Sequence, residues 1–239
     1  AGWKVAIIER GERVTRGPEN WADNGSIDLS PYYDKSLPYE VVKGGNKKQM
    51  GVYSAVGGPS IFYGGVSFRF RENDFKPSDE LVGDSEAQWP IDYDDLKEYY
   101  DEAEQLLQIA GEAGVDPTEP PRSQPFPQAT PPYAVVSQKV KSAAESLGLH
   151  PFHLPLAINY KSNQADNRAS CQFCITCDTF ACAVGAKNDL DTMLLSKMTN
   201  GAVDLYSGTI AHRIEVEDGQ VKKIHCVEKE SGAKVVFEG

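Results

Sequence analysis

The chain has 239 residues, of which 40% are hydrophobic and 25% are charged, and its formal net charge is −11. This length is sufficient to bury a sizeable core, and the composition is typical of a globular protein rather than a disordered one. The negative charge argues against nucleic acid or an anionic membrane surface as a partner, and no apolar stretch is long enough to span a bilayer.

The chain opens with an apolar, β-branched run over residues 3–8, which is followed by Glu9, Arg10 and Gly11. This pattern predicts a buried strand that ends in a turn. In dinucleotide-binding βαβ units, an acidic residue about 20 positions after a GxGxxG loop binds the ribose hydroxyls of the adenosine. A carboxylate suits this role because it accepts hydrogen bonds from both hydroxyls. Glu9 is therefore a candidate for that residue, and an ordinary core strand is the alternative.

Residues 12–53 are polar and contain several turn dipeptides, among them Gly17-Pro18, Asn24-Gly25 and Gly44-Gly45. Dipeptides of this kind typically mark turns and loops. We therefore expect an irregular surface excursion over this stretch.

A glycine-rich stretch follows, with two Gly-Gly pairs at Gly57-Gly58 and Gly64-Gly65 that enclose Pro59, Ser60 and Tyr63. Paired glycines allow the backbone to take positive φ angles and to approach a ligand closely. The stretch therefore predicts a loop that wraps a flat, phosphate-bearing molecule. The alternative is a glycine-rich turn between strands.

Two helices are predicted in the middle of the chain. Asp92 and Asp95 form a capping-box pattern before a run of apolar residues, spaced three to four apart, that extends to Leu107. A second helix is predicted over residues 135–147. Between the two helices, residues 117–132 contain seven of the fifteen prolines, which predicts an extended connector or an ordered loop.

Residues 150–158 have the pattern of an extended, proline-interrupted edge strand. They include His150 and His153, the one pair of histidines that lie close in sequence. No acidic residue or cysteine is adjacent to this pair, so we expect surface or loop histidines rather than metal ligands.

Four of the five cysteines, Cys171, Cys174, Cys177 and Cys182, lie within twelve residues. An iron–sulfur cluster, a structural zinc site and metal-free thiols or a disulfide are the three alternatives. The last spacing and the absence of a following proline argue against a ferredoxin-type cluster, and the absence of a second knuckle argues against zinc. Metal-free cysteines are therefore our prediction.

The last part of the chain predicts a helix, with Asn188 as its N-cap and Gly201 as its end, and then a β-meander. Asp218-Gly219 and Ser231-Gly232 have the composition of hairpin turns. The four expected strands cover residues 203–206, 209–216, 221–229 and 235–237.

Several of these stretches, in this order, resemble the glucose–methanol–choline (GMC) oxidoreductases. They are the strand that ends at Glu9, the glycine loop with the segment up to Phe75, and Trp-Pro-Ile-x-Tyr-Asp-Asp-Leu at residues 89–96. The cysteine segment is similar to a stretch of choline-dehydrogenase-like members, and that resemblance implies no metal.

The resemblance implies an α/β fold of mixed helices and strands. Its core would be a Rossmann-like FAD-binding domain with a β-meander and an interleaved substrate-binding region. The first part of the FAD-binding domain would be residues 1–80, and the substrate-binding or cap region with the proline-rich connector would be residues 81–165. Residues 166–239 would return to the FAD-binding domain and add the meander.

The resemblance also implies which residues contact FAD. They are Glu9, Arg10, Gly57, Gly58, Pro59, Ser60, Tyr63, Gly64, Gly65 and, through its main chain, Ala211. Phe62 holds the position from which a histidine attaches the flavin in covalent members, so FAD is expected to bind non-covalently. Ser60 and Tyr63 depart from the residues that the family usually has at these positions.

The implied activity is the FAD-dependent oxidation of a CH–OH group in an alcohol or a sugar, with hydride transfer to the flavin. The GxGxxG loop and the catalytic histidine region of the family have no counterpart in these residues. We therefore name no catalytic residue, and we expect a fragment that is inactive and binds FAD poorly by itself. The alternatives are an iron–sulfur electron-transfer module and a non-catalytic binding domain with a flavoprotein fold. The substrate, the electron acceptor and the compartment are not indicated.

Overall fold

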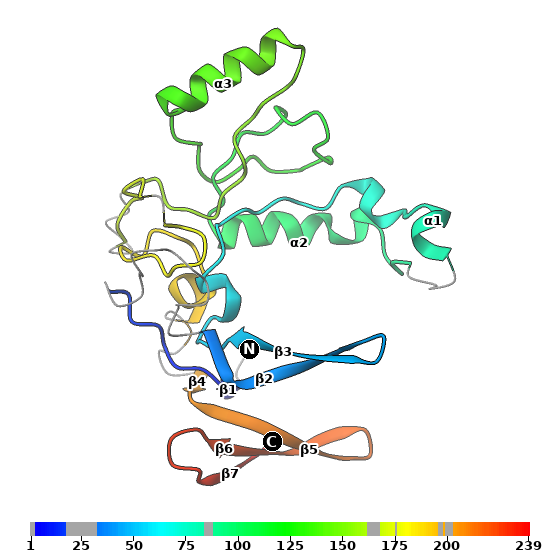
Figure 1. Cartoon of the computed structure of the whole chain (residues 1–239), viewed down its shortest axis with the longest axis vertical. Helices are drawn as coiled ribbons and strands as arrows, with labels where there is room; N and C mark the ends of the chain where they lie inside the picture. The colour runs from blue at the N-terminus through cyan, green and yellow to red at the C-terminus, as the bar shows by residue number, and fades with distance from the viewer. Residues whose placement is uncertain are drawn as a thin grey trace. The chain divides into compact units, whose positions relative to one another are not determined.

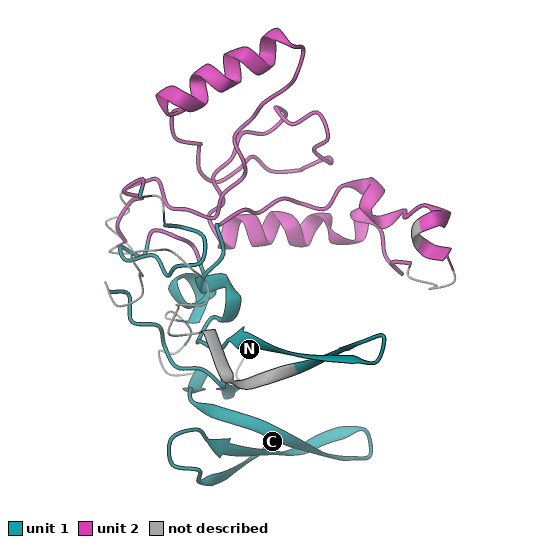
Figure 2. Ribbon diagram, viewed as in Figure 1, with its two compact units in different colours: residues 1–64, 174–185, 189–239 teal, residues 65–173, 186–188 magenta. Residues whose placement is uncertain are grey.

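The computed structural model describes residues 3–17, 33–83, 88–161, 168–174, 176–195, 198 and 203–239, with residues 33–39 and 81 described by their backbone alone. The chain forms two compact units, shown in different colours in Figure 2. Unit 1 comprises residues 1–64, 174–185 and 189–239, and unit 2 comprises residues 65–173 and 186–188. The roles assigned above to residues 1–80, 81–165 and 166–239 stay predictions.

Unit 1 contains a parallel strand pair and an antiparallel meander (Figure 1). β1 (Val5–Ile8) pairs in parallel with β4 (Val203–Tyr206). The meander consists of β5 (Thr209–Glu217), β6 (Gln220–Glu228) and β7 (Lys234–Glu238) in sequence order. The predicted strands at the two ends of the chain are thus confirmed. The turn at Asp218-Gly219 is also confirmed, because both of its residues have positive φ, as a two-residue hairpin turn requires.

The expected burial of β1 is wrong in part. Val5 is 43% exposed, and the strand becomes partly buried only toward Ile8. Within the described part of the chain, β1 is hydrogen-bonded to β4 alone. A two-stranded pair covers little of either face, so the apolar sequence of β1 is more exposed than its pattern predicts.

The expectation of an irregular excursion is wrong for residues 33–53. They form a hairpin of β2 (Tyr33–Lys43) and β3 (Asn46–Tyr53), joined at Gly44-Gly45 with φ values of 57° and 81°. These angles suit a two-residue hairpin turn. Residues 40–50 on both sides of the turn are exposed and mostly polar, so no alternation of apolar residues predicted strands there. Residues 18–32 of the same stretch lie outside the described residues.

Unit 2 contains the helices α1 (Asp79–Val82), α2 (Tyr93–Leu106) and α3 (Val135–Ser146). The predicted capping box of α2 is confirmed. Asp92 Oδ1 accepts hydrogen bonds from the backbone N–H groups of Asp94 and Asp95, and Asp95 Oδ2 accepts one from the Asp92 N–H at 2.9 Å. No described helix is both long enough and apolar enough to cross a membrane.

For the loops of unit 2, the structure confirms one prediction from the sequence and contradicts another. Residues 117–132 contain no helix or strand, as their prolines predict. Residues 150–158 do not form the expected edge strand, and Leu156 makes isolated bridges to Val66 and to Ala110 instead. Pro151 and Pro155 lack N–H donors, which limits regular pairing along this segment.

Within the described residues, the predicted helix after the cysteines includes the π-helical stretch η6 (Asp191–Leu195), and residues 196, 197 and 199–202 lie outside the description. The prediction of Asn188 as its N-cap is wrong. Asn188 is fully buried, and its side-chain amide donates to the Leu107 carbonyl at 2.7 Å. Asp189 takes the capping role, because its Oδ1 accepts from the Thr192 N–H at 2.8 Å. Gly201, the expected end of the helix, lies outside the described residues.

Candidate cofactor site

The end of β1 and the glycine loop lie side by side in unit 1. The Val56 N–H donates to the Glu12 carbonyl at 3.0 Å, and Glu12 forms a parallel bridge with Ala55. A Cβ atom at Gly11 would overlap the backbone of residues 54 and 55, so only glycine permits this approach. Two of the predicted cofactor segments, more than forty residues apart in sequence, are therefore in direct contact.

The first strand of the meander joins the same place. The Thr209 N–H donates to the Glu9 carbonyl at 2.9 Å, and the Gly208 N–H donates to the Gly11 carbonyl at 3.1 Å. Ala211 lies two residues further along β5, where it is exposed and pairs with Cys226. The structure thus brings the strands that carry Glu9 and Ala211 together beside the start of the glycine loop.

Glu9 has a carboxylate that is fixed on one side. Its Oε1 accepts a hydrogen bond from the Gly11 N–H at 2.7 Å, and its side chain is partly buried. Among the residues that the structure describes, none donates to Oε2. One carboxylate oxygen thus holds the turn, and the other keeps its capacity to accept a hydrogen bond from a ligand. Arg10 beside it is partly buried.

The first glycine pair has one packed residue and one open residue. Gly57 has φ 92°, and a Cβ there would lie 2.9 Å from Ile61 Cδ1 and 3.1 Å from the Asp191 nitrogen. Gly58 has φ 58° and begins the short helix η3 (Gly58–Ile61), yet a Cβ there would meet nothing within 4 Å. Gly57 is therefore required for packing within unit 1, whereas Gly58 presents its backbone to open space.

The remaining predicted residues of the loop are divided between the two units. Pro59 is exposed, with its carbonyl accepting from the Phe62 N–H at 3.0 Å, and Tyr63 and Gly64 are partly buried. Gly65 belongs to unit 2, where its carbonyl accepts from the Ala157 N–H at 2.7 Å. The predicted residues of this loop from Gly57 to Gly64 therefore lie in unit 1, and Gly65 lies in unit 2.

Ser60 ties the loop to η6. Its hydroxyl donates to the Gly57 carbonyl at 2.7 Å and accepts from the Leu190 N–H at 3.1 Å. On either side of Leu190, Asp189 is bound by Arg16 and Asp191 is bound by Arg13. These four charged residues are absent from the predicted site. No sequence pattern could have paired them, because more than 170 residues separate the partners.

The cysteine-rich segment packs against the same loop. The Thr179 N–H donates to the Phe62 carbonyl at 2.7 Å, and Arg16 donates to the Cys182 carbonyl at 3.4 Å. Ala181 shares a buried cluster with Phe62 and Ile61. Within the described ranges, no three His, Cys, Asp or Glu side chains lie close enough to hold a metal ion. The part of this segment in unit 1 supports the glycine loop, which the sequence did not indicate.

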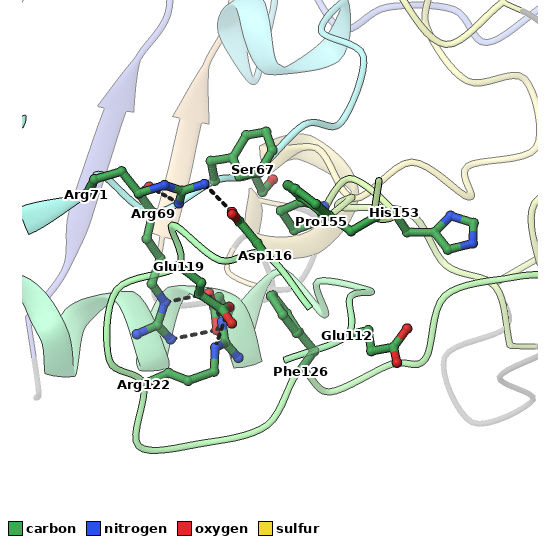
Figure 3. Close-up of a pocket in the computed structure, with 13 residues that line it drawn as sticks. Ser67, Arg69, Arg71, Glu112, Asp116, Glu119, Arg122, Phe126, His153 and Pro155 are labelled. Atoms are coloured by element: carbon green, nitrogen blue, oxygen red, sulfur yellow. Dashed lines mark hydrogen bonds and ion pairs between the residues drawn. The ribbon is translucent and has the colours of Figure 1, made fainter. Parts of the chain in front are cut away.

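A second group of charged residues lines a cavity in unit 2 (Figure 3). Arg69 binds both oxygens of Glu104 at 2.7 Å, and Arg122 binds the same carboxylate at 2.7 and 2.9 Å. Burial alone would lower the pKa of Arg69, but its hydrogen bonds to Glu104, Asp101 and Tyr93 raise that pKa above its ordinary value. Figure 3 also shows Arg71 pointing at Asp116, with which it forms an ion pair.

This cavity is too small for a sugar. The space open to the centres of water molecules is about 20 Å³, which is room for about one water. His153 lies at its edge, stacked on Tyr133 with ring centroids 3.7 Å apart, and burial lowers the pKa of this histidine. The ion network around Glu104 therefore ties Arg69 and Arg122 to α2 within unit 2.

No family model matches the chain, whereas individual known proteins are similar to it. The chain is 32% identical over 188 residues to 6'''-hydroxyparomomycin C oxidase of Streptomyces lividus, which covers 75% of this chain and 33% of that protein. It is 29% identical over 193 residues to the fructose dehydrogenase large subunit of Gluconobacter japonicus, which covers 71% of this chain and 34% of that protein.

A solved structure shows the same fold. An FAD-dependent oxidoreductase from Chaetomium thermophilum aligns with a TM-score of 0.57 and 16% identity, over 99% of this chain and 40% of that chain. These matches indicate a GMC-like flavoprotein. The mixed helices and strands of the chain are compatible with the expected α/β class of such a flavoprotein. The chain spans about a third of the length of the curated relatives that it matches.

Proposed function

We propose that this GMC-like flavoprotein oxidises a CH–OH group of a sugar or an alcohol. We also propose that unit 1 binds FAD, with the end of β1 at the adenosine and the glycine loop against the cofactor. The observation that carries the proposal is the junction of Glu12 with Ala55 and Val56, which joins the Glu9 strand end to the glycine loop. The relatives are named as an oxidase and a dehydrogenase of sugar-containing molecules, which supports the reaction class.

The residues of unit 1 fit FAD in three respects. Glu9 Oε2 would accept hydrogen bonds from the ribose hydroxyls, while Oε1 stays with the Gly11 N–H. Gly58 would allow the cofactor to approach the backbone, since its Cβ side faces open space. Ala211 would meet the adenine through its main chain on β5. FAD, when bound, supplies the hydride acceptor.

Non-covalent attachment is part of the proposal. Phe62 holds the position of the histidine that bonds the flavin in covalent members, and a phenyl ring carries no atom that could form such a bond. Phe62 is also 4% exposed and stacks on Tyr53 with ring centroids 4.2 Å apart. Its side chain is therefore committed to the core of unit 1.

The Rossmann-like arrangement and the division of roles are proposals as well. The parallel pair of β1 and β4, followed by the meander of β5 to β7, supports a nucleotide-binding sheet with an appended meander. On this basis residues 1–80 and 166–239 bind the cofactor, and residues 81–165 contribute to the substrate side. The substrate is a sugar or an alcohol, and no residue of this chain is proposed as the general base.

The test uses the complete product of the gene that encodes this sequence, purified and mixed with FAD. Fructose, an amino sugar and a primary alcohol are added in turn without oxygen, and the visible flavin absorbance is recorded. We expect one class of substrate to bleach the flavin. Glu9→Gln should weaken FAD binding by about 1.5–3 kcal/mol, the usual range for a hydrogen bond to a charged group. The exposed Glu217→Gln on β5 is the matched control. A protein that holds no FAD would contradict the proposal.

A further inference from the structure

The glycine loop is in contact with Leu190, a residue far from the loop in sequence, through the side chain of Ser60. Gly57 and Gly58 both have positive φ, and glycine backbones sample many such conformations when nothing holds them. Ser60 supplies the restraint. Its hydroxyl donates its single proton to the Gly57 carbonyl and accepts the Leu190 N–H, so the loop is fastened to the backbone of residues 189–192.

Residues 189–192 are themselves fixed by charge. Asp189 is fully buried, and both of its oxygens accept from Arg16 at 3.1 Å. Arg16 also donates to the Thr192 hydroxyl at 2.9 Å, and Arg13 pairs with Asp191. The pair of Arg16 and Asp189, whose side chains are 19% and 0% exposed, is largely removed from water and holds its geometry more firmly than an exposed pair. The segment is therefore anchored to residues 13–16, a few positions after Glu9.

We propose that residues 189–192 are a clamp that sets the glycine loop for FAD, and that Ser60 is the positioning residue through which the clamp acts. The inference rests on the proposed function, because it concerns the same cofactor. Ser60 therefore acts by fixing the loop and does not donate a hydrogen bond to FAD, because its one hydroxyl proton is already donated to the Gly57 carbonyl. A loop that is ordered before FAD arrives loses less conformational entropy on binding, and this raises the affinity.

The test compares Ser60→Ala, Ser60→Thr and Ser142→Ala in the complete gene product. Ser142 is a matched control because its hydroxyl also bonds a carbonyl, that of Gln138 at 3.0 Å, but on α3 in unit 2. The dissociation constant of FAD is measured by quenching of flavin fluorescence, and the melting temperature is measured by circular dichroism. Ser60→Ala should raise the dissociation constant about tenfold, because FAD would then have to order a loop that is no longer fastened, and the conformational entropy lost by fixing about one residue accounts for that factor. Ser60→Thr keeps the hydroxyl and should stay within about threefold, and Ser142→Ala should not change it.

The outcomes separate this inference from the proposed function. If the unmutated protein binds no FAD, the proposed function fails. If it binds FAD and Ser60→Ala binds equally well, or if Ser60→Ala lowers only the melting temperature, the clamp is wrong. Asp191→Asn keeps the shape of the clamp and removes its charge toward Arg13, so it tests the same idea if Ser60→Ala does not fold. It should raise the dissociation constant about threefold, and an unchanged value would overturn the clamp.

Discussion

Alanine at Gly57 and alanine at Gly58 probe the two faces of the glycine loop separately. Both positions have positive φ, where a residue other than glycine costs about 1–2 kcal/mol. At Gly57 the new methyl group would also lie 2.9 Å from Ile61 Cδ1 and 3.1 Å from the Asp191 nitrogen. Overpacking of this kind typically costs a further 1–3 kcal/mol. Gly57→Ala should therefore lower the unfolding free energy by roughly 2–5 kcal/mol.

Gly58→Ala should behave differently because its Cβ meets nothing within 4 Å. We expect a loss of only about 1 kcal/mol, and Gly185→Ala is the matched control, since it has φ 64° and equally open space in unit 1. For a chain of this size, 1 kcal/mol corresponds to about 2–4 °C in melting temperature. The melting temperature should thus fall far more in Gly57→Ala than in the other two variants.

FAD affinity then distinguishes packing from binding. Gly58→Ala places a methyl group where the proposal brings FAD to the backbone, so it should weaken FAD binding well beyond the effect of Gly185→Ala. Fluorescence titration of the complete gene product measures both values. Equal affinities in Gly58→Ala and Gly185→Ala would refute the reasoning, and so would an unchanged melting temperature in Gly57→Ala.

The ion network of unit 2 and the cysteine segment give three more predictions. Glu104→Gln should lower the unfolding free energy in urea by about 3–5 kcal/mol, because two buried cations, Arg69 and Arg122, lose the carboxylate that they share and Arg69 keeps only Asp101. The exposed Glu98→Gln on α2 should change the unfolding free energy by less than about 0.5 kcal/mol. Burial raises the pKa of Asp101, but hydrogen bonds from Ser123 and Arg69 outweigh it and hold that pKa below its ordinary value of 3.8. The stability that Asp101 contributes is therefore present above pH 3.8 and is lost as the pH falls below that value, and Asp101→Asn should remove this loss from acid-unfolding curves. For the cysteine segment, metal analysis of the purified protein should find no iron, and a sulfide assay should find no acid-labile sulfide. Stoichiometric iron would favour the iron–sulfur electron-transfer alternative.

Local sequence signals predicted much of the fold. The capping box at Asp92 and the hairpin turn at Asp218-Gly219 depend on residues a few positions apart, so their chemistry can be read directly from the sequence. The hairpin of residues 33–53 was missed because residues 40–50 around its turn are mostly polar and exposed, although Gly44-Gly45 is a turn signal. Asn188 was misread because a buried side chain that bonds distant carbonyls has the same local sequence as an N-cap.

The candidate site was predictable in its parts but not in its assembly. Glu9 and the glycine loop were found through their resemblance to a family, and each has a local physical reason for its residue types. Their contact depends on Gly11, where an added Cβ would overlap residues 54 and 55. The pair of Arg16 and Asp189 spans 173 residues. Partners so far apart are chosen by the folded structure, and nothing in either local sequence specifies the other.

The visible absorption spectrum of the complete gene product, recorded after addition of FAD and desalting, shows directly whether the protein retains the flavin. We expect that flavin bands remain with the protein, that acid precipitation releases the flavin because its attachment is non-covalent, and that Gly58→Ala retains less flavin than Gly185→Ala. A colourless protein after desalting would contradict the assignment of unit 1 as a cofactor site.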